Sequence, residues 1–150
     1  MTIKDMLVLL DNGHATPDKP AVSRGTGNPD VDAIGPGPTL AIDLARRLEA
    51  HVTAVALAVD PIVPGFVVAP LPVEVIEQAR TQAVEVARTA AERFRGLAER
   101  GGVAAETRIA EILMGGAPEG FVVNCRSTDL VVIGQDDPDR PEPMREAMIE

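Results

Sequence analysis

The stretch that decides the fold is Thr128–Gln135, TDLVVIGQ. Its four consecutive apolar residues, Leu130–Ile133, end at a glycine, and the chain then enters an acidic segment interrupted by prolines, DDPDRPEP. A short apolar run rich in β-branched residues and closed by glycine predicts a buried parallel strand that opens into a loop. Met6–Leu10 has the same pattern and is followed by Asp11 and Asn12. An open α/β sheet binds ligands at the carboxyl ends of its strands, so these two strand ends are the first place to look for a site.

The composition limits the classes of protein and of partner. The chain has 150 residues, 45% of them hydrophobic, which is enough for one domain with a substantial core. Its formal net charge of −9 argues against nucleic acid and against an anionic membrane surface, because both attract clustered Lys and Arg. A single cysteine, Cys125, excludes an internal disulfide and a cysteine-based zinc site. No apolar run has the length of a membrane span and the first residues lack a secretory leader pattern, so we expect a soluble cytoplasmic protein.

Strand and helix patterns alternate along the chain. The predicted strands are Met6–Leu10, Val52–Val59, Val103–Ile112 and Leu130–Ile133, and the predicted helices are Leu40–Glu49, Val73–Arg100, a short segment from Pro118, and Pro143–Glu150. This alternation predicts an α/β fold with a doubly wound parallel sheet and right-handed crossovers. The third strand alternates polar and apolar residues, which indicates a less buried position at an edge of the sheet.

Three local features need an interpretation. Residues 12–38 are dense in Gly, Pro, Asp and Asn, and they predict a long surface connection or, alternatively, a lid over the strand ends. Thr39 is the expected N-cap of the helix that follows. Cys125 lies on the apolar side of a short helix, and only Arg126 beside it is positively charged, so we expect a small core residue rather than a reactive thiol.

With these elements in order, the chain resembles the universal stress protein family. The matching segments are MLVLLD (Met6–Asp11), AIDLARRLEAHVTAVALAVDP (Ala41–Pro61), AERGG (Ala98–Gly102) and TDLVVIGQ (Thr128–Gln135). The resemblance implies the adenine nucleotide alpha hydrolase-like fold, with strand order 3-2-1-4-5 and a topological switch between strands one and four. We expect the order 3-2-1-4 here, with the fifth strand absent from this chain. The chain would then be one domain, residues 1–150, with a loop insertion at 12–38; it would be the first half of a tandem protein, a fragment, or a degenerate single domain.

The resemblance also implies a set of site residues. In nucleotide-binding members, the residues after strand one and at the end of strand two hold adenosine, and the chain after strand four holds phosphate. The matching positions are Asp11, Asn12, Ala58, Val59, Ile133, Gly134 and Gln135.

The phosphate loop departs from the family pattern, which is G-x2-G-x9-G-[ST]. Only Gly134 is retained, whereas Asp137 occupies the second glycine position, Ala147 lies near the third, and Met148 occupies the hydroxyl position. Glycines allow backbone N–H groups to approach phosphate oxygens. The segment 136–139, DDPD, instead places three carboxylates where a triphosphate would lie, and each like-charge contact near 4 Å costs about 1–4 kcal/mol. We therefore expect no ATP cofactor.

Three functions remain open at this point. The first is a stress-response domain that acts by association, without ATP and without enzymatic activity. The second is an adenine-nucleotide protein that binds AMP or ATP, with at most slow hydrolysis. The third is a metal-dependent enzyme that uses His14, Asp18 and the acidic cluster Asp136–Asp139, although an acidic run in a proline-rich loop is usually solvated. The expected partner is a second copy or the second domain of a tandem protein, which would cover the apolar edge of strand four.

Overall fold

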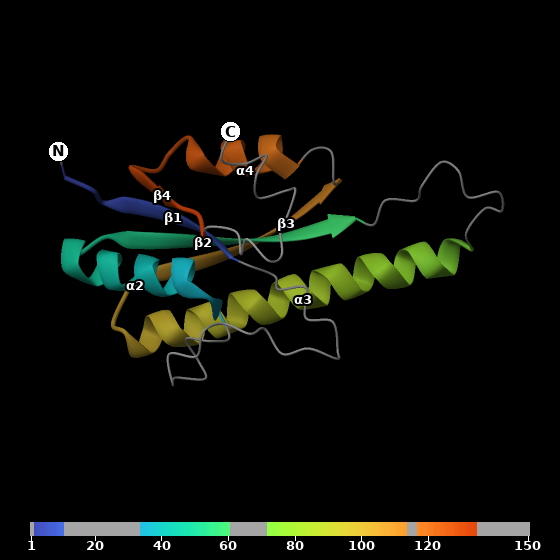
Figure 1. Ribbon diagram of the computed structural model, residues 1–150, viewed down its shortest axis with the longest axis horizontal. Helices are drawn as coiled ribbons and strands as arrows, with labels where there is room; N and C mark the ends of the chain where they lie inside the picture. Colours follow the sequence, from blue (N-terminus) through green and yellow to red (C-terminus); the bar gives the residue numbers. More distant parts are fainter. Residues whose placement is uncertain (1, 11–33, 61–71, 114–116, 135–150) are drawn as a thin grey trace.

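The computed structural model describes residues 2–10, 34–60, 72–113 and 117–134 (Figure 1). The elements in chain order are β1 (Asp5–Leu10), α2 (Pro36–Leu48), β2 (His51–Asp60), α3 (Val73–Arg100), β3 (Ala105–Leu113), α4 (Ala117–Cys125) and β4 (Leu130–Val132). The predicted helix at Pro143–Glu150 and most of the predicted connection at 12–38 lie outside the described residues.

The four strands form one parallel sheet in the order β3-β2-β1-β4, which confirms the predicted order and the predicted edge position of the third strand. β1 is central because its apolar run has no polar side to present to water, and the residues from Met6 to Leu10 are buried. β1 pairs with β2 from Asp5 opposite His51 to Leu10 opposite Ala56. It pairs with β4 over three positions only, ending at Val8 opposite Val132.

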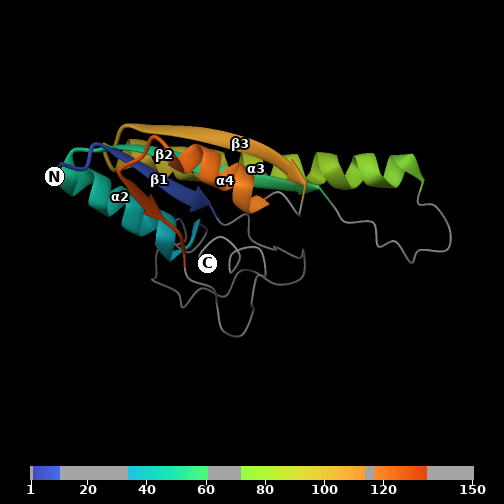
Figure 2. The same ribbon diagram turned by 90° about the horizontal axis from the view of Figure 1, so that it is seen from above.

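The two faces of the sheet are covered by different helices. In Figures 1 and 2, α2 and α3 lie on one face and α4 lies on the other. Alternate residues of β1 point to opposite faces, so Met6 and Val8 pack with α2 and α3 while Leu7 and Leu9 pack with Phe121 of α4. This three-layer arrangement is that of a doubly wound sheet.

The 28-residue helix α3 extends beyond the sheet (Figure 1). One side of α3 is buried in its carboxyl-terminal half, where Ala87 and Phe94 are 0% exposed. Towards the amino end the exposed fraction rises, and it reaches 64% at Val73. The helix ends where predicted, with Gly101 donating its N–H to the Leu97 carbonyl at 2.9 Å.

The start of α2 differs from the sequence prediction. The helix begins at Pro36, and Thr39 lies in its first turn, where its hydroxyl donates to the Gly35 carbonyl at 2.9 Å. Thr39 is therefore not the N-cap, which is Gly35 in a positive-φ conformation (φ 81°). The physical reason is that proline at the first helical position already has a helical φ and needs no N–H there, so the sequence GPGP starts a helix rather than ending a loop. Residues 36–38 accordingly belong to α2 and not to the preceding connection.

Candidate functional site

The carboxyl ends of β1, β2 and β4 meet at one end of the sheet, as the strand order requires. The last residue of β1, Leu10, pairs with Ala56, so the predicted site residues Ala58 and Val59 extend beyond it on one side. Val132 pairs with Val8, which brings Ile133 and Gly134 level with the end of β1 on the other side. The structure thus brings four of the seven predicted site residues to the two flanks of β1. The other three, Asp11, Asn12 and Gln135, lie outside the described residues.

Three of these four residues, Ala58, Val59 and Ile133, have side chains that contribute mainly to the core. Ala58 is 2% exposed and belongs to the cluster beneath α2 and α3. Val59 and Ile133 are partly buried and pack against the cluster beneath α4. The flanks of β1 are consequently apolar, and any polar recognition at this end has to come from backbone groups or from residues that follow the strands.

The first turn of α2 lies against the end of β4, a contact that the sequence interpretation did not include. A Cβ atom on Gly37 would lie 3.1 Å from both the Cα and the backbone N of Gly134. That separation is closer than ordinary van der Waals contact, so the helix and the strand end approach this closely only because residue 37 is glycine. The pattern GPGP at residues 35–38 was the available signal, because it combines a helix-start proline with a small residue.

This helix start is a poor anion site. The N-terminus of a helix normally offers four unpaired N–H groups, and it attracts phosphate for that reason. Pro36 and Pro38 remove two of the four donors from α2, and the N-cap contributes no side-chain hydrogen bond. Together with the close approach of Gly37 to Gly134, this leaves a triphosphate little to bind at the described strand ends. These residues therefore do not fit the phosphates of ATP.

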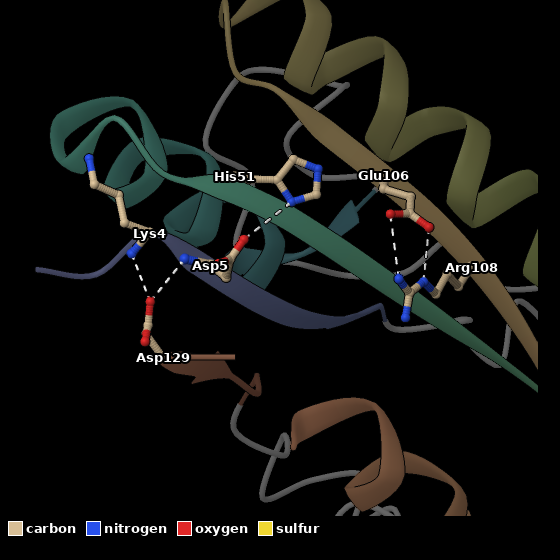
Figure 3. A network of polar contacts seen from close by, with 6 residues as sticks. All are labelled: Lys4, Asp5, His51, Glu106, Arg108 and Asp129. Carbon is tan, nitrogen blue, oxygen red and sulfur yellow. Dashed lines mark hydrogen bonds and ion pairs between the residues drawn. The ribbon is translucent and has the colours of Figure 1, made fainter. Parts of the chain in front are cut away.

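A cluster of polar contacts occupies the opposite, amino-terminal end of the sheet (Figure 3). The Asp129 carboxylate accepts hydrogen bonds from the backbone N–H groups of Lys4 at 2.8 Å and Asp5 at 3.1 Å. The Asp129 N–H in turn donates to the Asp5 carbonyl at 2.8 Å. The two backbone hydrogen bonds hold the pKa of Asp129 below its usual value. Asp129 thus ties the start of β4 to the start of β1, and it was not among the predicted functional residues.

Two further polar contacts belong to this end of the sheet. His51 Nδ1 lies 4.0 Å from the Asp5 carboxylate, and both side chains are partly exposed. On the edge strand β3, Arg108 Nε donates to the Glu106 carboxylate at 2.9 Å. The hydrogen bond and the positive charge of Arg108 lower the pKa of Glu106. Exposed pairs of this kind contribute little to stability.

The described residues contain no group of three or more His, Cys, Asp or Glu side chains placed to hold a metal ion. His14, Asp18 and Asp136–Asp139, the residues of the metal hypothesis, lie outside the described ranges. Cys125 is partly buried, its Sγ lies 3.4 Å from the Phe121 carbonyl, and burial raises the pKa of its thiol. A raised thiol pKa is the opposite of what a nucleophile needs, and it agrees with the predicted core role.

Comparison with known proteins identifies the fold. Three solved structures superpose on nearly the whole chain: the universal stress protein UspA from Lactobacillus plantarum (TM-score 0.66, 16% identity, 99% of this chain and 92% of that chain), a universal stress protein family member from Burkholderia pseudomallei (0.59, 18%, 98% and 88%), and a universal stress protein from Archaeoglobus fulgidus (0.52, 16%, 97% and 90%). The chain has the universal stress protein fold. The resemblance noted in the sequence is therefore confirmed at the level of the fold.

No protein-family model matches the chain, and no curated protein matches its sequence. Within the described ranges, none of the helices is long and apolar enough to cross a membrane.

Proposed function

We propose that this chain is a universal stress protein-like stress-response domain that acts by association with another protein, without ATP and without enzymatic activity of its own. The observation that carries the proposal is the start of α2, which lies against Gly134 through Gly37 and offers two prolines where a phosphate site needs N–H donors. The fold and the replacement of the glycine pattern by DDPD at 136–139 support the same proposal.

The proposed partner at the β4 edge is a second copy of the chain or the second domain of a tandem protein, in the cytoplasm. Among the described residues, β4 has a strand neighbour on one side only. All three of its residues are apolar, and natural edges that stay unpaired are usually charged or interrupted by proline. An apolar edge of this kind favours coverage by another chain or domain.

The second candidate function is binding of AMP or another adenine nucleotide in which the adenosine contributes most of the affinity. It is favoured by the position of Ala58 and Val59 on one flank of β1 and of Gly134 on the other, which is the switch-point arrangement of open α/β sheets. Apolar flanks suit an adenine ring better than a charged phosphate chain.

Isothermal titration calorimetry with Mg-ATP, AMP and adenosine tests both functions. We expect no dissociation constant at or below about 10 μM for Mg-ATP, which corresponds to roughly −7 kcal/mol. Tighter Mg-ATP binding would contradict the proposal. If AMP or adenosine binds, Asp11→Ala should weaken the binding, whereas Asp5→Ala, at the opposite end of β1, should leave the affinity unchanged. Equal affinities in the two variants would remove Asp11 from the site.

A further inference from the structure

The second edge of the sheet, formed by β3, has a regular and accessible backbone. β3 has nine residues, and among the described elements it has a strand neighbour on one side only. The Val52 N–H donates to the Ala104 carbonyl at 3.0 Å, and Val52 is in register with Ala105. In a parallel ladder, successive residues direct their backbone groups alternately to either side. The even-numbered residues of β3 therefore face β2, and the odd-numbered residues from Ala105 to Glu111 direct their N–H and C=O groups away from β2.

The side chains along this edge carry a short, alternating charge pattern. Glu106 and Arg108 are two positions apart, lie on the same face of the sheet and are each about half exposed. On the other face Ile109 is 39% exposed, although it is a large apolar residue on a strand. Sheet edges are usually kept from pairing by charged side chains or proline. β3 has no proline and carries charges of both signs, Glu106, Arg108 and Glu111, so in a suitable register its charges attract those of a second strand.

The hydrogen-bond directions and the charges select one register for self-pairing. When two copies pair antiparallel about a two-fold axis, outward-facing residues must oppose outward-facing residues. Centring the axis on Thr107 meets this condition, and it places Glu106 of each copy directly opposite Arg108 of the other. Centring it on Ala105 or Ile109 leaves both charges opposite uncharged residues. Centring it on Glu106 or Arg108 would set like charges opposite each other, which destabilises a strand pair.

We propose that β3 is a homotypic interface, in which two copies of this chain pair antiparallel about Thr107 to form one continuous sheet. Ala105 of each copy then lies opposite Ile109 of the other and covers part of its exposed surface. A two-fold axis perpendicular to the sheet keeps the α3 helices of the two copies on the same face. The inference goes beyond the proposed function, because it concerns the edge opposite β4 and leaves both the β4 edge and the carboxyl ends of the strands uncovered.

Charge reversal at the two positions tests this interface. Glu106→Arg alone puts positive charges opposite each other at both cross-strand pairs, and Arg108→Glu alone puts negative charges there. We expect each variant to lose dimer affinity at least tenfold relative to the parent, measured by sedimentation equilibrium. Mixing the two variants should restore a dimer, because the mixed pair has an Arg–Glu contact at both positions. Native mass spectrometry should show this heterodimer well above a random share.

The double variant E106R/R108E sharpens the test. It retains the net charge and the local pair on β3, so it should dimerise as tightly as the parent, but it should not pair with the parent, since like charges would then face each other. Reversals of the exposed pair Glu85 and Arg88 on α3 serve as matched controls away from the edge, and they should leave dimerisation unchanged. Any of three results would overturn the inference. The parent could be a monomer, the single variants could dimerise as tightly as the parent, or the mixed single variants could form homodimers and heterodimers at random. None of these results would bear on ATP binding, which calorimetry tests separately.

Discussion

The two edge strands of the sheet are held in place by different means. β3 is aligned with β2 over nine positions, so a long backbone ladder fixes it although, from Ala105 to Ile112, half of its residues are exposed and none is fully buried. β4 is aligned with β1 over only three positions. Its place depends on burial of Val132, on the approach of Gly37 to Gly134, and on the hydrogen bonds of Asp129 to the start of β1. A short strand therefore needs specific side-chain contacts where a long strand has its ladder, and single substitutions should affect β4 far more than β3.

Placing a lysine on each edge is expected to produce the largest contrast. Val132 is 9% exposed and packs in the cluster beneath α2 and α3, so Val132→Lys buries an unpaired charge and should lower the free energy of unfolding by about 3–5 kcal/mol. The matched variant Ile109→Lys, at a partly exposed position of β3, should lower the free energy of unfolding of the monomer by no more than about 1 kcal/mol. Urea denaturation at low protein concentration measures both. Similar losses in the two variants would show that the edges are held alike.

The contact between the start of α2 and the end of β4 should give the next largest effect. In Gly37→Ala the new methyl group meets backbone atoms of Gly134 at 3.1 Å, which cannot rotate away, so we expect a loss of about 1–3 kcal/mol. Gly96→Ala is the control, because its nearest neighbour is the flexible end of Arg100 at 3.4 Å, and an alanine inside α3 should stabilise by about 0.5–1 kcal/mol. Chemical denaturation of both variants checks the sign as well as the size. A neutral Gly37→Ala variant would mean that α2 and β4 can separate at no cost.

Acid titration should give the smallest effect. It compares the two edges through one carboxylate on each, Asp129 beside β4 and Glu106 on β3. The folded-state pKa of Asp129 is lowered by its backbone hydrogen bonds, so its contribution is present above the unfolded value and is lost as the pH falls through the folded one. Asp129→Asn should lower the melting temperature at neutral pH and flatten the decline that the parent shows below about pH 4. The pKa of Glu106 is lowered by Arg108 on the same strand, so the sign is the same. Glu106→Gln should shift the melting curve less, because that pair is local and exposed. A steeper acid decline in Asp129→Asn than in the parent would contradict this assignment.

Most of the architecture was predictable from local patterns. The apolar run at Met6–Leu10 predicted a central strand because a strand without a polar side has to be covered on both faces. The bounds of α3 were predicted correctly as Val73–Arg100, and the helix ends where the chain reaches Gly101 and Gly102. The alternation in the third strand correctly placed it at an edge. Each of these signals lies within one element and depends on how that helix or strand is exposed to water.

Less of the candidate site could be predicted from the sequence in this way. Ala58, Val59, Ile133 and Gly134 were brought to the flanks of β1 as expected, because parallel strands end on the same side of a sheet. The helix start at Pro36 was missed, because prolines and glycines at 35–38 read equally well as loop and as N-terminal turn. That boundary matters for the shape of the candidate site, since the first turn of α2 lies against Gly134.

The sequence by itself determined the class of fold, the strand order implied by its resemblance, and the departure from a phosphate-binding glycine loop. These depend on residue type and short-range spacing, which set the hydrophobic period and the permitted backbone conformations. Only the tertiary structure decided that Gly37 and Gly134 share one small volume and that Asp129 binds backbone groups at Lys4, 125 positions away along the chain. The register with β2 was likewise needed to decide which backbone groups of β3 face outward, and so which pairing would place Glu106 opposite Arg108. Contacts between distant segments leave little local trace in a sequence, because each residue involved is also compatible with many other surroundings.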